Sequence, residues 1–118
     1  FPADHGPHPA FRTEWWYFTG NLATAQGRRF GYQLTFFRTA LAPDTAPAQR
    51  ASPWASRQLW MAHFALTDVA TGRFLARERF ARQGAGLAGA AATPHAVWLE
   101  GWRADGPPRG SSLFPLRL

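Results

Sequence analysis

The stretch Phe30-Gly31-Tyr32-Gln33-Leu34-Thr35-Phe36-Phe37-Arg38 decides the fold class, because large apolar side chains fall at every second position. Such alternation of aromatic and polar residues is typical of a β-strand with one buried face. We therefore expect a strand here and no helix. One face of it carries Phe30, Tyr32, Leu34 and Phe36, and the other carries Gly31, Gln33, Thr35 and Phe37.

The same pattern recurs along the chain, where clusters of Trp, Phe, Tyr and Thr are separated by Gly, Pro and Ala. No stretch shows helical periodicity with caps at both ends. Short connections at Gln26-Gly27 and Thr71-Gly72 suit antiparallel hairpins. The predicted class is all-β, a curved antiparallel sheet or barrel. The expected strands are Trp15–Leu22, Arg28–Thr39, Leu59–Val69, Arg73–Arg82, Val97–Trp102 and Leu113–Leu118.

Alternation also assigns faces in two other strands. In the third strand Trp60, Phe64 and Leu66 share a face, opposite Met61, His63 and Ala65. In the fourth, Phe74, Ala76 and Phe80 share a face with Glu78, while Arg73, Arg77 and Arg79 lie opposite. We expect the face with the large aromatic residues to be the core-like one.

Two connections are long. Ala40–Arg57 is rich in Ala, Pro and Ser and is expected to be an insertion or a flap. Gln83–His95 is a Gly/Ala run, expected to be a flexible loop. Its G-x-G-x-x-G spacing, at residues 84–89, follows an antiparallel strand and no helix follows it, so it does not indicate a dinucleotide site.

Composition limits the function classes. The chain has 118 residues, with 13 basic residues against 7 acidic ones and no cysteine. The absence of cysteine from this sequence excludes disulfides, zinc–thiolate sites and a cysteine nucleophile within it. Every basic residue is arginine, which suggests coding bias more than nucleic-acid binding, and the arginines of the fourth strand lie opposite its aromatics. No apolar run reaches the roughly 18 residues of a membrane helix.

The N-terminal segments carry a family resemblance. They contain Phe1-Pro2-Ala3-Asp4-His5-Gly6-Pro7-His8, then Arg12-Thr13-Glu14-Trp15-Trp16-Tyr17-Phe18-Thr19-Gly20, the strand at 30–38, Trp60-Met61-Ala62-His63-Phe64-Ala65-Leu66-Thr67-Asp68 and Phe80-Ala81-Arg82. In this order they resemble the lipocalin-like AttH / carotenoid 1,2-hydratase family, whose members are often described as secreted hydrolases.

The resemblance implies a calycin fold with two lipocalin-like barrels in tandem. Residues 1–118 then form most of the first barrel, and we expect both chain ends to be cut. It further implies a small apolar ligand such as a lipid or isoprenoid and a second barrel as partner. An association with ABC-transporter components and a periplasmic or secreted location are also implied, with a cytoplasmic one as the alternative. Some members hydrate or cyclise alkenes, but their catalytic acid has no matching motif here.

Glu14 is the sharpest candidate for chemistry. Beside an apolar wall of Trp15, Trp16 and Tyr17, a buried carboxyl group can donate a proton to an alkene. The alternative is that these aromatic residues close the barrel base while Glu14 pairs with Arg12 or Arg38. Both interpretations remain open from the sequence.

His63 is the second catalytic candidate, either as a base or as a partner for the polar head of a ligand, and the alternative is a wall residue whose hydrogen bonds are satisfied by the protein. Glu78 must meet an arginine or face solvent, because a buried unpaired carboxylate is costly. The predicted ligand contacts are Trp15, Trp16, Tyr17, Gln33, Thr35, Arg38, His63 and Glu78.

Other chemistry finds little support. The pair His5 and His8 lacks the third and fourth ligands of a metal site, and no G-x-S-x-G motif accompanies the serines. We expect no cofactor, no metal and no nucleic-acid partner. The preferred hypothesis is a lipocalin-like domain that holds a small hydrophobic molecule, and the alternative is an acid-catalysed hydratase or cyclase. With few strands for a closed barrel, we also expect an open sheet edge.

Overall fold

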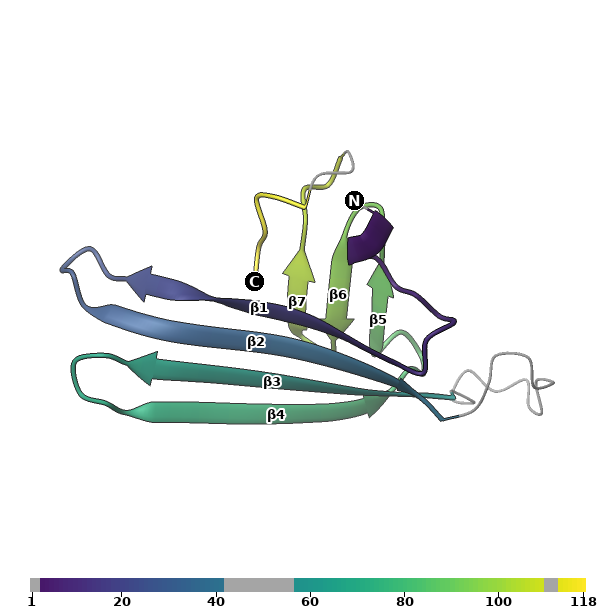
Figure 1. Ribbon diagram of the computed structural model, residues 1–118, viewed down its shortest axis with the longest axis horizontal. Helices are drawn as coiled ribbons and strands as arrows, with labels where there is room; N and C mark the ends of the chain where they lie inside the picture. Colours follow the sequence, from purple (N-terminus) through teal and green to yellow (C-terminus); the bar gives the residue numbers. More distant parts are fainter. Residues whose placement is uncertain (1–2, 42–56, 110–112) are drawn as a thin grey trace.

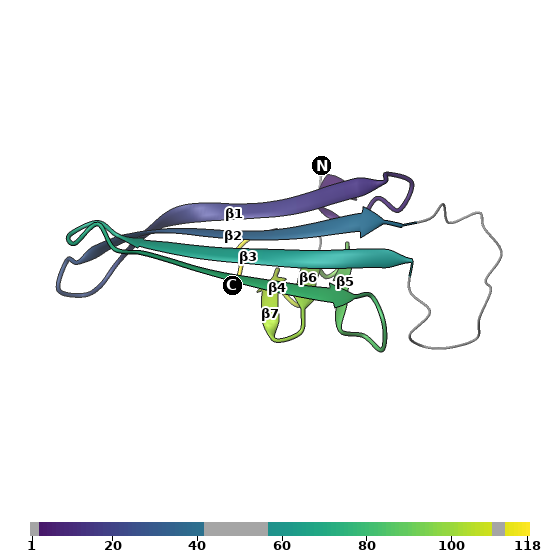
Figure 2. The same ribbon diagram turned by 90° about the horizontal axis from the view of Figure 1, so that it is seen from below.

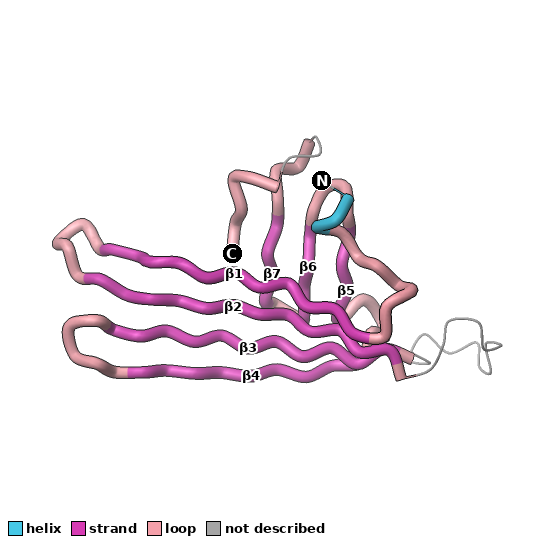
Figure 3. Tube along the Cα trace, viewed as in Figure 1, coloured by secondary structure: helices cyan, strands magenta, loops and turns pink. Residues whose placement is uncertain are grey.

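The computed structural model describes residues 3–41, 57–109 and 113–118. Strands dominate it, and the helical content of these ranges is one 3₁₀ turn, η1 (Ala3–His5), drawn in cyan in Figure 3. The four long strands are β1 (Thr13–Ala23), β2 (Arg29–Ala40), β3 (Gln58–Asp68) and β4 (Phe74–Arg82). The three short strands are β5 (Ala88–Ala91), β6 (Ala96–Leu99) and β7 (Trp102–Asp105). The all-β prediction is confirmed.

The strands form two antiparallel sheets. The long sheet has the order β1-β2-β3-β4 and the short sheet has the order β5-β6-β7. In Figure 1 the short sheet stands on one face of the long sheet with its strands crossing the long strands steeply. Seen from below, the four long strands lie side by side (Figure 2). Within the described residues the sheets do not close into a barrel, and β1 and β4 are the edges of the long sheet.

Both predicted hairpins are confirmed. Gly27 (φ 80°) closes the β1–β2 turn and Gly72 (φ 68°) closes the β3–β4 turn, positions that favour glycine because φ is positive. The Gly72 amide donates to the carbonyl of Asp68 at 2.9 Å. These turns fix the register in which Trp15 faces Phe37 and Met61 faces Phe80.

The core lies where the short sheet covers the long one. Trp16 from β1 and Trp60 from β3 stack across β2, with ring centroids 5.5 Å apart and planes 9° apart. Phe36 on β2 is fully buried at 0% exposure. The short sheet contributes small and aliphatic side chains to the same core, namely Ala88, Val97, Leu99 and Ala104.

One loop prediction and two strand predictions need correction. The run Gln83–His95 is not a loop throughout, because it contains β5, where Gly89 leaves room for the indole of Trp98. The predicted strand Val97–Trp102 is split, because Glu100 has φ 54° and turns the chain between β6 and β7. The predicted strand Leu113–Leu118 makes a single bridge, Asp105 to Arg117. The long connection Ala40–Arg57 falls mostly on residues 42–56, outside the described residues.

The face assignment of the fourth strand was also wrong. The register places Arg77 opposite Phe64 and Arg79 opposite Ala62, so these two arginines of β4 share the face of the core. The Arg79 guanidinium lies 5.5 Å from the Trp102 ring centroid and pairs with Glu100 in the turn between β6 and β7. The methylene groups of an arginine side chain can cover a hydrophobic core while the guanidinium group stays in contact with water. Phe74 and Phe80 instead lie on the other face, at 65% and 58% exposure.

Candidate functional site

The register divides the predicted ligand contacts between the two faces of the long sheet. We call the face covered by the short sheet the packed face, and the opposite one the open face. Trp16 and Arg38 lie on the packed face, as do Leu34 and Trp60. The remaining predicted contacts lie on the open face: Trp15, Tyr17, Gln33, Thr35, His63 and Glu78. The predicted set therefore does not line one common cavity wall.

On the open face these residues form rows across the strands. Tyr17, Thr35, His63 and Glu78 are consecutive partners from β1 to β4. The His63 Nε2 atom lies 3.5 Å from a Glu78 carboxylate oxygen, and these side chains are 37% and 61% exposed. Glu78 thus faces solvent, one of the two outcomes expected for it.

A neighbouring row on the open face is apolar. It contains Trp15, Phe37, Met61 and Phe80. The Phe37 ring makes edge-to-face contacts with the rings of Trp15 and His63, with ring centroids 6.4 and 5.5 Å apart respectively. On the same face, the side-chain amide of Gln33 donates a hydrogen bond to the Thr35 hydroxyl group at 3.5 Å.

Glu14 is ion-paired, and its partner is Arg38. The Arg38 Nε atom donates to Glu14 Oε2 at 2.7 Å, and Arg38 is only 2% exposed. The other carboxylate oxygen accepts from the His8 amide at 2.5 Å and lies 3.0 Å from His8 Nδ1. Arg38 also donates to the carbonyls of His8 and Phe11. The pairing that the sequence left open is present, and it ties the N-terminal segment to β1 and β2.

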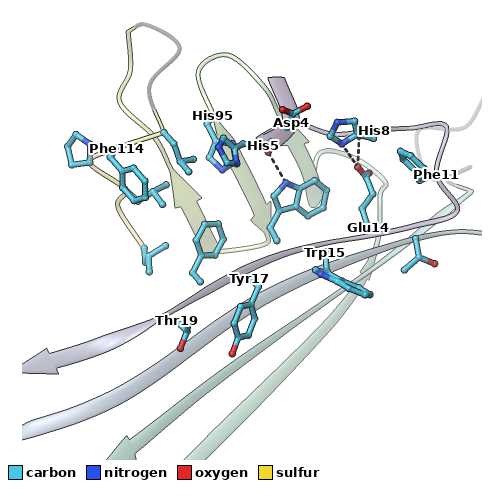
Figure 4. A pocket seen from close by; sticks show the side chains of 18 of the residues that line it. Asp4, His5, His8, Phe11, Glu14, Trp15, Tyr17, Thr19, His95 and Phe114 are labelled. Atoms are coloured by element: carbon cyan, nitrogen blue, oxygen red, sulfur yellow. Dashed lines mark hydrogen bonds and ion pairs between the residues drawn. The ribbon is translucent and has the colours of Figure 1, made fainter. Parts of the chain in front are cut away.

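A cavity of about 840 Å³ runs along the free edge of β1, beneath the N-terminal segment and the C-terminal segment 113–118 (Figure 4). Its lining includes Glu14 and the aromatic residues Trp15, Trp16 and Tyr17. It also includes His5, His8 and His95, and Tyr32 with Leu116 and Leu118. We call this the edge cavity.

A second cavity of about 660 Å³ lies between the two sheets. Phe64 on β3 and Trp102 on β7 meet edge to face in its wall, with centroids 6.2 Å apart. Its complete lining is Leu22, Tyr32, Leu34, Phe64, Gly101, Trp102, Arg103, Leu116 and Leu118. It shares Tyr32, Leu116 and Leu118 with the edge cavity. We call the two together the inter-sheet cleft.

His95 was missed as a site residue by the sequence analysis. It lines the edge cavity and is only 6% exposed, and both ring nitrogens are buried without a hydrogen-bond partner in the described structure. Burial lowers the pKa of His95, His5 lowers it further, and Asp105 opposes the shift. A single histidine at the end of a Gly/Ala run carried no periodic signal that would have identified it.

Two other observations concern the described residues alone. Residues 3–41, 57–109 and 113–118 bring no three His, Cys, Asp or Glu side chains together in a way that could hold a metal ion. No helix in the same ranges has the length and apolar character to cross a bilayer.

The comparisons with known proteins settle the family. The AttH-like family model matches residues 1–118. The chain belongs to the AttH-like family. A solved AttH-like protein from Nitrosomonas europaea is 38% identical, with a TM-score of 0.69 over 91% of this chain. This chain spans 30% of the length of that protein. No protein in the search of curated proteins matches it.

The predicted family and the lipocalin-like all-β class are therefore confirmed.

Proposed function

We propose that this AttH-like domain binds a small, elongated apolar molecule in the inter-sheet cleft. The observation that carries the proposal is the cavity of about 660 Å³ walled by Leu34 and Phe64 on one sheet and Trp102 on the other. Ligand sites in proteins are commonly concave, mainly apolar and about 300–1,000 Å³ in volume. The edge cavity lengthens the available space.

The charge distribution around the cleft supports an apolar occupant. Arg103 lines the cleft, but its guanidinium is paired with Asp105 at 2.9 Å and lies over the Trp98 ring at 5.5 Å. Its charge is thereby already compensated. Transfer of each buried methylene group from water contributes about 0.8 kcal/mol, so a chain of ten or more carbons gains enough to offset the cost of immobilisation.

The position proposed for the ligand differs from the one that the sequence suggested. Trp15, Tyr17, Gln33, Thr35, His63 and Glu78 were the predicted contacts, yet they share the open face. Of these, Trp15 and Tyr17 also line the edge cavity, but the cavity between the sheets uses Tyr32, Leu34 and Phe64 from the packed face. Hydration or cyclisation of an alkene lacks a comparable supporting observation, because both oxygens of Glu14 already accept hydrogen bonds from protein donors.

Two glycines provide a matched test. A Cβ atom on Gly101, which lines the cleft, meets nothing within 4 Å, and the same holds for Gly31 on the open face. Gly101→Leu therefore places a side chain at the cleft, while Gly31→Leu is a control of equal size. Binding to the intact natural protein is measured by fluorescence titration with the neutral apolar probe 1-N-phenylnaphthylamine.

We expect saturable binding to the natural protein, weakened about tenfold by Gly101→Leu and unchanged by Gly31→Leu, because the probe and the leucine compete for one space. Urea unfolding of both variants checks that they are folded. Loss of binding in Gly31→Leu alone contradicts the proposal and places the ligand on the open face. An absence of saturable binding to the natural protein also overturns it.

A further inference from the structure

The inter-sheet cleft has a polar end. Most of its lining is apolar, but the end of the edge cavity beneath the N-terminal segment contains His5, His8 and His95. Figure 4 shows these histidines gathered on the side of the pocket away from Thr19 and Tyr17. A long cavity with one polar end is suited to an amphipathic molecule.

His95 is the residue at this end whose bonding is incomplete. The neighbouring histidines have hydrogen-bond partners. The carbonyl of His5 accepts from the Trp16 indole at 3.0 Å, and His8 Nδ1 lies 3.0 Å from Glu14 Oε1. The backbone of His95 is also fixed, since its carbonyl accepts from the Gly106 amide at 2.8 Å. Its two ring nitrogens, in contrast, are buried without partners in the described structure. A buried donor or acceptor left unpaired costs about 1–3 kcal/mol, so a partner for this ring is favoured.

The surroundings of His95 select a neutral partner. Asp4 and Glu14 line the same cavity, and Asp105 acts on His95 from β7. Glu14 is paired with Arg38, and Asp105 is paired with Arg103, so neither of these arginines is available to a carboxylate group of the ligand. Because burial lowers the pKa of His95, the ring is neutral at pH 7, with one nitrogen that donates and one that accepts. A hydroxyl group can donate as well as accept, so it can satisfy either nitrogen.

We propose that His95 forms a head-group subsite, at which the hydroxyl group of a long-chain alcohol or similar neutral lipid hydrogen-bonds to the imidazole while the chain extends into the cleft toward Phe64 and Trp102. This inference rests on the proposed function, because it needs an apolar ligand in the cleft. It adds the chemical class of the ligand and the end of the cleft at which its polar group lies.

The test compares two probes of the same number of heavy atoms, dodecan-1-ol and tridecane, as competitors of 1-N-phenylnaphthylamine on the intact natural protein. The measured quantity is the ratio of the two affinities. This ratio is determined for the natural protein and for each variant, and the ratios are then compared. His95→Phe keeps a flat ring and removes both nitrogens. His63→Phe is the matched control, because His63 lies on the open face of the long sheet.

We expect His95→Phe to shift the ratio against the alcohol by about threefold to tenfold, the range that one net hydrogen bond supplies. His63→Phe leaves the ratio unchanged. If both probes bind and His95→Phe does not change the ratio, the subsite is refuted while the proposed function stands. If neither probe competes, the proposed function fails, and the subsite fails with it.

A second readout does not depend on the folding of His95→Phe. In the ¹⁵N-labelled natural protein, the ring nitrogens of His95 are expected to shift on addition of dodecan-1-ol and not of tridecane, because only the alcohol forms a hydrogen bond with them. Identical shifts with both probes, or no shift with either at saturation, overturn the subsite.

Discussion

Trp16 and Trp60 stack with ring centroids 5.5 Å apart and planes 9° apart, on the face that also carries the fully buried Phe36. They come from β1 and β3, which are not hydrogen-bonded to each other. The stack therefore joins β1 to β3 over the intervening β2, on the face that the short sheet covers. In contrast, Trp15 is adjacent in sequence but 67% exposed on the open face. Because one ring is buried under the short sheet and the other is exposed, we expect substitutions at Trp60 and Trp15 to differ in their effect on stability.

Trp60→Phe is expected to lower the free energy of unfolding by about 2 kcal/mol, because it removes buried ring volume that the neighbours cannot refill. Trp15→Phe makes the same chemical change at an exposed position, and we expect a change within about 0.5 kcal/mol. Urea unfolding curves of both variants provide the comparison. Equal losses in the two would show that the packed and open faces are assigned wrongly.

Glu14→Gln is expected to destabilise the protein by about 3 kcal/mol, because it leaves the guanidinium of Arg38 buried at 2% exposure without its carboxylate. Two carbonyls still accept from Arg38, which keeps the loss at the lower end of the range for a broken buried pair. Glu78→Gln is the control, since Glu78 is 61% exposed. We expect that variant to be nearly neutral. A stable Glu14→Gln protein would argue against the buried ion pair.

The contribution of Asp68, at the β3–β4 turn, to the free energy of unfolding depends on pH. Hydrogen bonds from Arg28 and Thr71 are the main reason that the pKa of Asp68 is lowered to about 2 from its usual 3.8. A carboxyl group with a lowered pKa binds protons less readily in the folded state than in the unfolded state. Its stabilisation is therefore complete above about pH 4 and is lost as the pH falls toward 2.

Asp68→Asn is expected to flatten that part of the profile of unfolding free energy against pH and to lower stability at pH 7. Denaturant unfolding between pH 2 and 7 measures the effect. A variant profile parallel to that of the natural protein below pH 4 would show that Asp68 does not carry this dependence.

Gly89→Ala is expected to cost about 1–3 kcal/mol, because the new Cβ would lie 2.6 Å from the Trp98 ring. That ring is held in place by its bond to the carbonyl of Gly86 at 3.0 Å and by Arg103. Gly101→Ala meets no neighbour within 4 Å and is expected to be nearly neutral. The melting temperature of Gly89→Ala is therefore expected to be lower than that of Gly101→Ala. Equal melting temperatures would contradict the close packing of Trp98 on β5.

The long sheet was largely predictable from the sequence. Alternation such as that in Phe30–Phe36 identifies strands directly, and glycine turns at Gly27 and Gly72 identify the hairpins. The short sheet was harder to predict. Ala88–Ala91 has no large side chains to alternate, and the positive φ of Glu100 that separates β6 from β7 has no local sequence signal.

The site was less predictable than the fold, because its location depends on contacts between distant segments. Alternation alone says which residues of β4 share a face, but only the pairing of Phe80 with Met61 says which face that is. The cleft likewise combines distant segments, because Leu116 and Leu118 of the C-terminal segment line both cavities together with Tyr32 of β2. The pair of Glu14 with Arg38 was within reach of the sequence, since an ionised residue beside buried aromatics requires a partner.

The most direct test of ligand binding in the inter-sheet cleft is a crystal structure of the natural protein with 12-bromododecan-1-ol, in which anomalous scattering locates the bromine atom. We predict one strong bromine peak inside the cleft, in contact with Phe64 and Trp102. A peak on the open face beside Met61 and Phe80, or no peak in crystals grown where solution binding is saturated, would contradict the proposed function.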